Sequence, residues 1–159
     1  MRTSLRRLMP ALAFVLAGLL TVLGQVSASA DASKGSGDCP KQSQHRSPEQ
    51  VLEAHLAAVR SGNAALVACD YAKDATFILP GSVAQGTDQI EAAFAGFFAS
   101  AGPINSVTTT SVTTEKNSIL MTYKIDSEHI VVSEGVDTFV IEKGRIVLQT
   151  AYLGGLVAL

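Results

Sequence analysis

The hydrophobic periodicity of the chain changes near Pro103, from a helical repeat to a strand repeat. Before this point, apolar residues recur every three to four positions over 51–59 and again over 90–98. After it, alternating β-branched residues predict four strands, over 107–114, 119–125, 130–141 and 145–153. Helices followed by an antiparallel meander are typical of an α+β fold in which the helices cover one face of the sheet.

Capping residues predict where the helices begin and end. Residues 47–50 read Ser-Pro-Glu-Gln, which is a capping box with proline at the first helical position. The first helix is expected to end at Ser61, and Asn63 is expected to cap a shorter second helix. Thr87 is expected to cap the third helix.

Turn residues predict the strand connections. Pro80-Gly81 closes a strand expected over 75–79, and Lys143-Gly144 is a tight hairpin turn between the last two strands. Apolar residues occur on both strand faces, as with the neighbours Leu120 and Met121. The outer face of the sheet is therefore a candidate homodimer interface, although single exposed apolar residues are ordinary.

The first 30 residues have the three parts of a secretory signal peptide. Three arginines precede an apolar stretch over 8–23, and Ala28-Ser29-Ala30 matches a cleavage site. We expect a secreted or periplasmic protein that has no membrane contact after cleavage, and the alternative is an uncleaved anchor. A flexible polar lead-in is predicted over 31–46, followed by one folded domain over 47–159.

The charge balance excludes one class of partner. The chain has 12 Lys and Arg against 14 Asp and Glu, and three of the arginines belong to the leader. The exported domain is therefore acidic, whereas a nucleic-acid binder needs a basic surface to neutralise phosphates.

The two cysteines are expected to pair, because thiols in small exported domains usually form disulfides. A bond between Cys39 and Cys69 would close a loop of about 30 residues and stabilise the fold by about 3–4 kcal/mol in the chain-entropy model. The alternative is a buried Cys69 and a free Cys39. Two thiols also exclude a four-cysteine zinc site, and neither has the neighbours of a catalytic thiol.

Three segments resemble the nuclear transport factor 2-like superfamily, and within it the SnoaL-like and ketosteroid isomerase-like branch. They read AAVRSGNAALVACDYAKDATFILP, QGTDQIEAAFAGFF and GVDTFVIEKGRIVLQTA, and the resemblance covers residues 47–152. It implies a cystatin-like, cone-shaped α+β barrel, in which three N-terminal helices pack on a curved antiparallel sheet around a pocket. The superfamily includes isomerases, cyclases, dehydratases and proteins without catalysis, so the fold alone does not decide the function.

Asp137 is the most informative polar residue. In the strand segment 136–141 it shares a face with Phe139 and Ile141, and a carboxylate that faces a core is costly unless it is paired or protonated. The ketosteroid isomerase-like members resemble this chain here, and their acid donates a hydrogen bond to a developing oxyanion. The alternative is that Asp137 faces water or caps a bulge beside Gly135.

His55 lies on the apolar face of the first helix, where the isomerase-like members have an oxyanion-stabilising tyrosine. It is expected either to form an acid–histidine pair with Asp137 or to be a buried, hydrogen-bonded core residue. The chain departs from these members at Leu79, where they carry the carboxylate that shuttles the proton. Steroid isomerisation by that mechanism is therefore not expected.

The remaining candidates are one polar cluster and a set of aromatic or apolar residues. Asp126, Glu128 and His129 cluster in a turn but lack the spacing of a metal site, so we expect a solvated loop and no metal. No cofactor motif is present. The candidate pocket-lining residues, which are otherwise core residues, are Tyr71, Phe77, Leu79, Phe94, Phe98, Met121, Tyr123, Phe139 and Tyr152.

The sequence therefore favours an exported protein that binds a small apolar molecule in a mostly apolar, cone-shaped pocket, with Asp137 and His55 as polar anchors. One alternative is an isomerase-, cyclase- or dehydratase-like enzyme that uses Asp137 as the acid and His55 as the base. A second alternative is a non-catalytic, homodimeric association module. Whether the protein is an enzyme stays open at this point.

Overall fold

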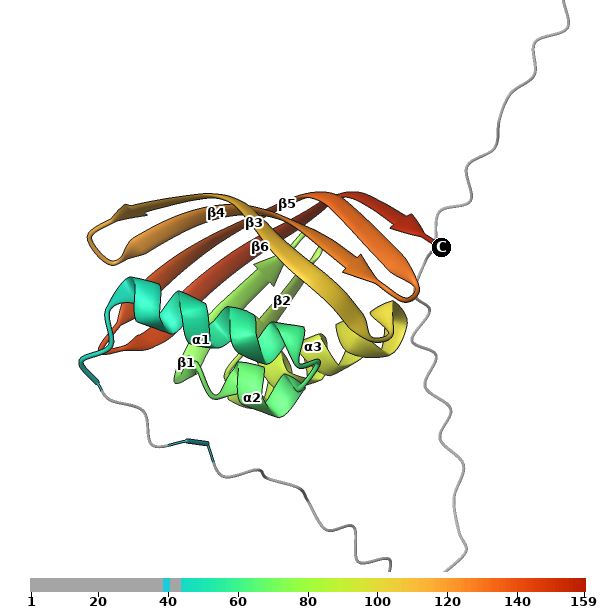
Figure 1. Ribbon diagram of the computed structural model, residues 1–159. Helices are drawn as coiled ribbons and strands as arrows, with labels where there is room; N and C mark the ends of the chain where they lie inside the picture. The colour runs from blue at the N-terminus through green and yellow to red at the C-terminus, as the bar shows by residue number, and fades with distance from the viewer. Residues whose placement is uncertain (1–38, 41–43) are drawn as a thin grey trace, which may run out of the picture. The chain divides into compact units, whose positions relative to one another are not determined.

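The computed structural model describes Cys39, Pro40 and residues 44–159 (Figure 1). The predicted leader, over 1–30, and most of the lead-in lie outside the described residues. The described part forms three helices and six strands: α1 (Pro48–Arg60), α2 (Ala64–Ala68), β1 (Tyr71–Leu79), β2 (Ser82–Gln85), α3 (Thr87–Ala101), β3 (Ile104–Glu115), β4 (Ser118–Ser127), β5 (Ile130–Glu142) and β6 (Arg145–Ala158). None of the helices seen in this part is long and apolar enough to cross a membrane.

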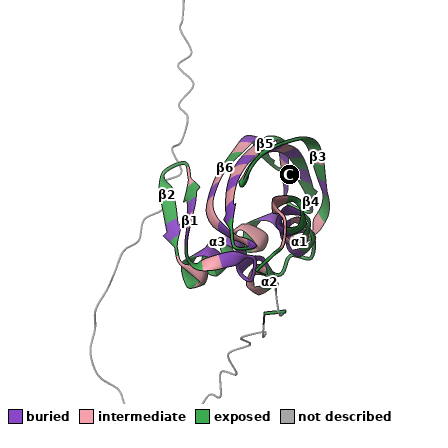
Figure 2. Ribbon diagram, turned by 90° about the vertical axis from the view of Figure 1, so that its left-hand side faces the viewer, coloured by how far each residue is buried: buried purple, intermediate pink, exposed green. Residues whose placement is uncertain are grey.

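The strands form one curved sheet in the order β2-β1-β6-β5-β4-β3. Strands β3 to β6 are an antiparallel meander, β1 and β2 form a hairpin, and β1 joins the meander through a parallel pairing with β6. Figures 1 and 2 show the long strands arching over the helices, with the β1–β2 hairpin at one side. The predicted α+β class, with helices on a curved and mostly antiparallel sheet, is confirmed. The sheet has two free edges and is not closed.

The predicted caps of the first two helices are confirmed. The Ser47 hydroxyl accepts a hydrogen bond from the Gln50 amide, and the Gln50 side chain accepts one from the Ser47 amide at 2.8 Å. The Asn63 side chain accepts a hydrogen bond from the Leu66 amide at 3.1 Å. These reciprocal bonds satisfy amides that the first helical turn leaves without partners.

Two predictions near the third helix were wrong. Gly86, with a φ of 79°, is the N-cap of α3, and Thr87 is its first helical residue and caps nothing. The strand expected over 75–79 begins at Tyr71, and the short strand β2 was missed. Four mostly exposed residues after a turn have too little periodicity to be recognised as a strand, because their hydrogen bonds to β1 define them.

The β5–β6 hairpin determines which residues of β5 lie on the inner face of the sheet. Lys143 and Gly144 have φ values of 48° and 67°, as the predicted tight turn requires. Burial alternates along β5, so Asp137, Phe139 and Ile141 lie together on the inner face.

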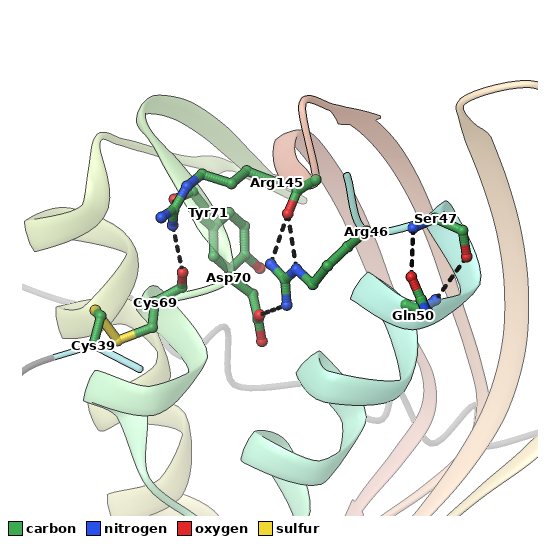
Figure 3. Close-up of polar contacts among 9 residues, drawn as sticks. Cys39, Arg46, Ser47, Gln50, Cys69, Asp70, Tyr71 and Arg145 are labelled. Carbon is green, nitrogen blue, oxygen red and sulfur yellow. Dashed lines mark hydrogen bonds and ion pairs between the residues drawn. A yellow bond between two sulfur atoms is a disulfide. The ribbon is translucent and has the colours of Figure 1, made fainter. Parts of the chain in front are cut away.

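The predicted disulfide between Cys39 and Cys69 is confirmed, with 5.4 Å between the Cα atoms (Figure 3). It lies beside a second link, in which Arg46 donates hydrogen bonds to the Asp70 carboxylate and to the Gly144 carbonyl oxygen. Together they join the chain before α1 to the end of α2 and to the β5–β6 turn.

Candidate functional site

A cavity of about 130 Å³ lies between α1, α3 and the inner face of the sheet. Its volume is close to that of an apolar cavity of about 150 Å³ that holds benzene, and below the roughly 300–1,000 Å³ of drug-sized pockets. The cavity therefore suits a very small molecule, and a four-ring steroid exceeds it. It is lined by His55, Leu56, Val59, Phe77, Leu79, Ala93, Phe94, Phe97, Val107, Met121, Tyr123, Ile125, Asp137, Gln149, Ala151 and Leu153.

The structure brings most of the sequence-derived candidates to this cavity. Those that line it are His55, Phe77, Leu79, Phe94, Met121, Tyr123 and Asp137. Tyr71 and Phe139 are buried beside it without lining it, and Phe98 is half-buried on α3. Tyr152 is 59% exposed, because the alternation of β6 turns it to the face opposite Gln149 and Ala151.

The Asp137 carboxylate is held by two neutral donors. The Tyr123 hydroxyl donates to Oδ1 at 2.9 Å, and the Gln149 amide nitrogen donates to Oδ2 at 2.7 Å. The Gln149 carbonyl oxygen accepts from the Tyr71 hydroxyl. Strands β1, β4, β5 and β6 thus each contribute one residue to a buried chain of hydrogen bonds, and the carboxylate does not face bulk water.

Burial dominates the electrostatics of Asp137. Removal from water raises the pKa of the Asp137 carboxyl to about 7, although the hydrogen bonds from Tyr123 and Gln149 act in the opposite direction. Burial, together with the neighbouring Asp137 charge, raises the pKa of the Tyr123 hydroxyl well above its usual value. Near neutral pH, both the protonated and the ionised form of Asp137 are therefore populated, and the Tyr123 hydroxyl stays protonated.

His55 is a neutral imidazole beside this network. Burial lowers the pKa of His55 to about 4. Its ring meets Tyr71, Phe94 and Phe139 edge-on, with ring centroids 5.4–5.8 Å apart. Its Nδ1 atom is buried without a hydrogen-bond partner, and no hydrogen bond joins His55 to Asp137 within the described part of the chain.

Gly135 makes room for the Tyr123 ring. Tyr123 lies directly opposite Gly135 in the β4–β5 register, and Asp137 follows two positions along β5. A Cβ atom on residue 135 would collide with the Tyr123 ring. The missing side chain lets the ring lie across the strand and bring its hydroxyl to Asp137.

Sequence reasoning missed Gln149. It is buried on the inner face of β6, in phase with Ala151, and it lies opposite Phe139. The signal that singled out Asp137, a polar residue in the buried phase of a strand, was also present here. Applied to β6, it would have found Gln149.

Among the described residues, neither Asp70 nor the cluster of Asp126, Glu128 and His129 lines the cavity. Asp70 pairs with Arg46 at 2.8 Å, at the disulfide end of the domain (Figure 3). No set of three histidine, cysteine or acidic side chains is placed to hold a metal ion within residues 39–40 and 44–159.

Comparisons with solved structures show how widely this fold occurs. An NTF-2 like protein of unknown function from Burkholderia xenovorans is 20% identical, with a TM-score of 0.58 over 67% of this chain and 82% of its own. A protein with a ketosteroid isomerase-like fold from Catenulispora acidiphila, in complex with trimethylamine, is 16% identical, with a TM-score of 0.59 over 69% and 88%. No curated protein sequence matches the chain significantly.

A third protein of similar fold is described as an enzyme. An epoxide hydrolase/cyclase-like enzyme of pyran ring formation in the polyether salinomycin is 12% identical, with a TM-score of 0.60 over 70% of this chain and 95% of that one. At these identities the similarities establish the fold alone. The SnoaL-like domain family model matches residues 52–149, which is more than half of the chain and includes every polar residue of the cavity. The chain therefore belongs to the SnoaL-like domain family, as its sequence resemblance indicated.

Proposed function

We propose that this protein binds a small, largely apolar molecule in the cavity, with Asp137 and His55 as the polar groups that orient it. The observation that carries the proposal is the buried carboxylate of Asp137, which lines a mostly apolar cavity with both oxygens hydrogen-bonded. Keeping a carboxylate in such a place costs free energy that an apolar residue would avoid. A binding site, with apolar walls and a few polar groups, is the ordinary reason for that arrangement.

Native mass spectrometry tests this function. The protein purified from its own host is compared with Asp137→Asn and with Asp74→Asn, which makes the same chemical change at an exposed position of β1. We expect a small molecule to accompany the wild type and Asp74→Asn and to be reduced or absent in Asp137→Asn. The same occupancy in all three proteins would contradict a role of Asp137 in binding.

The pKa of Asp137 also supports a second candidate, an isomerase-, cyclase- or dehydratase-like enzyme. A carboxyl group with a pKa of about 7 donates and accepts protons efficiently at neutral pH, and the Tyr123 hydroxyl lies 2.9 Å away. The salinomycin enzyme with the same fold acts in ring formation. Incubating the co-purified molecule with wild type and Asp137→Asn separates the candidates, because only an enzyme converts it to a product of different mass or retention time.

The outer face of the sheet supports the proposal of a homodimer. Leu120 and Tyr152 are 48% and 59% exposed, and half-buried Val136, Thr138 and Thr150 surround them without a charged residue among them. Symmetric pairing of this face would cover it. Light scattering after size exclusion should give twice the chain mass for the wild type and a smaller mass for Leu120→Lys, and a monomeric wild type would refute the dimer.

We also propose that the protein is exported to the periplasm or the medium. The leader pattern supports this, and the Cys39–Cys69 disulfide is the bond expected in an oxidising compartment. N-terminal sequencing of protein from the cell envelope or the medium should find a chain that starts at Asp31. A chain that starts at Met1 and stays in the cytoplasm would overturn the proposal.

A further inference from the structure

Among the described residues that line the cavity, Asp137 is the one acidic side chain, and none is a Lys or Arg that could balance it. His55 does not balance it either, because burial lowers the pKa of its imidazole to about 4 and leaves it neutral. The nearby Arg60 of α1 is exposed, and its guanidinium donates to the Val107 carbonyl oxygen. The ionised carboxylate therefore has no positive partner among the cavity-lining residues.

The hydrogen bonds around Asp137 suit the ionised form of the carboxylate. The Tyr71 hydroxyl donates to the Gln149 carbonyl oxygen, which turns the amide NH₂ group toward Asp137. The Tyr123 hydroxyl donates to the other carboxylate oxygen. A carboxylate has about four acceptor positions, so two donors leave capacity for a ligand that also donates.

The apolar wall is suited to a compact cation. Phe77 and Phe94 stack with ring centroids 5.3 Å apart, and both line the cavity together with Phe97. Aromatic rings attract cations through their negative faces. A volume of about 130 Å³ admits a body about the size of benzene.

We propose that the ligand is a small ammonium compound, with one amine on a compact apolar body, whose ammonium group pairs with the Asp137 carboxylate. This inference rests on the proposed binding function and specifies the chemical class of the ligand. A cation supplies the positive charge that the cavity lacks, whereas a neutral molecule of the same shape leaves the carboxylate charge unbalanced. Discrimination between the two is therefore the property to measure.

The titration of Asp137 can be separated from that of the groups that face it. Tyr123 of β4 and Tyr71 of β1 have pKa values raised well above their ordinary value, and Gln149 of β6 does not titrate. His55 of α1 titrates only near pH 4, and α3 and β3 contribute only apolar lining residues. Between pH 5.5 and 8, Asp137 is thus the titrating group of the cavity, with a pKa of about 7.

The experiment is a calorimetric or NMR titration of the disulfide-bonded protein with tert-butylammonium chloride, tert-butanol and benzene. The first two probes have the same number and arrangement of heavy atoms and differ in charge. At pH 8 we expect the ammonium probe to bind at least about tenfold more tightly than the alcohol, as charge-assisted hydrogen bonds imply. At pH 5.5 its affinity should fall about tenfold or more, because most of the carboxyl groups are then protonated.

Variants separate the contribution of the charge. Asp137→Asn should remove the preference for the ammonium probe, and Asp74→Asn should retain it. If Asp137→Asn does not fold, the wild-type pH dependence and the comparison of the two matched probes still decide. Binding of tert-butanol or benzene as tight as that of the ammonium probe overturns this inference and leaves the binding function standing. Absence of binding by all three probes overturns both.

Discussion

Two buried carboxylates at different places in this domain differ in what balances their charge. Asp70, just before β1, is 2% exposed and forms an ion pair of 2.8 Å with Arg46. Asp137, in the middle of β5, is 5% exposed, and within the described part of the chain its hydrogen bonds come from the neutral groups of Tyr123 and Gln149. The first charge is balanced inside the protein, whereas the second is left for a proton or a ligand to balance.

The surroundings of the two carboxylates explain this difference. The Asp70 end carries the disulfide, and the Arg46 guanidinium also bonds to the Gly144 carbonyl oxygen, so that region joins separate segments (Figure 3). The Asp137 region surrounds a cavity. A buried charge with an internal partner indicates a structural role, and a buried charge without one is a candidate for function.

Removing the partner of Asp70 should have the largest effect. Arg46→Met breaks the ion pair of the buried Asp70 carboxylate and removes two hydrogen bonds to Gly144, so we expect a loss of about 3–5 kcal/mol of unfolding free energy. Urea unfolding measures it. Arg60→Met is the control, because the exposed Arg60 makes a single long hydrogen bond, and it should cost less than about 1 kcal/mol. Equal losses in the two variants would contradict the structural role of Asp70.

Opening the disulfide should have a slightly smaller effect at the same end of the domain. Replacing both Cys39 and Cys69 by alanine should lower the unfolding free energy by about 3–4 kcal/mol, because the bond closes a loop between residues 30 positions apart. Binding at the cavity should survive in the fraction that remains folded. A variant that is fully folded but has lost binding would break the proposed separation of the two regions.

The pH dependence of the unfolding free energy tests how Asp137 and His55 titrate in the folded protein. The pKa of Asp137 is raised from 3.8 to about 7, so its stabilising contribution is complete below pH 3.8 and is lost as the pH rises through 7. The pKa of His55 is lowered from 6.5 to about 4, so its contribution is complete above pH 6.5 and is lost as the pH falls through 4. Between about pH 4 and 6.5 the two opposite trends offset each other in the wild type.

Asp137→Asn removes the carboxyl group, so the pH dependence of its unfolding free energy should reflect the titration of His55 alone. We expect its unfolding free energy, relative to the wild type, to fall by up to about 3 kcal/mol from pH 6.5 to pH 4, since one pKa unit corresponds to about 1.4 kcal/mol. Asp74→Asn should follow the wild type. Parallel pH profiles for Asp137→Asn and the wild type would show that the two groups do not titrate as described.

The smallest effect is expected from the outer member of the hydrogen-bond chain. Tyr71→Phe removes the hydroxyl that donates to the Gln149 carbonyl oxygen and leaves that buried acceptor without a partner, at a cost of about 1–2 kcal/mol. Tyr152→Phe, at an exposed position, should stay within about 0.5 kcal/mol of the wild type. Thermal unfolding of both variants is the measurement, and similar shifts would argue against a buried network.

Features that depend on residues close to one another in the sequence could be predicted from it. The caps at Ser47 and Asn63 and the turn at Lys143-Gly144 are short-range patterns, and each is present. The inward position of Asp137 followed from the alternation of its own strand. These signals need no knowledge of which strands are neighbours, which is why they succeeded.

The partners of Asp137 could not be predicted in the same way. Tyr123 lies opposite Gly135, and Gln149 lies opposite Phe139, so both meet Asp137 diagonally across the register of two strand pairs. That register is set by packing of the whole sheet and by the space beside Gly135. No hydrogen bond joins Asp137 to His55 among the described residues, and the donors to the carboxylate come instead from β4 and β6.

The parallel pairing of β1 with β6 has a consequence for the order of folding. Tyr71 pairs with Ile146 and Ile78 with Thr150, so this contact joins segments more than 70 residues apart, whereas β3, β4 and β5 pair with their immediate neighbours. Contacts this distant in the chain require closure of a long loop and form slowly. Because Phe77 and Leu79 of β1 line the cavity, its wall is complete only after β1 has paired with β6. We therefore expect ligand binding to appear late in refolding, after the helices and the first strand pairs of the meander have formed.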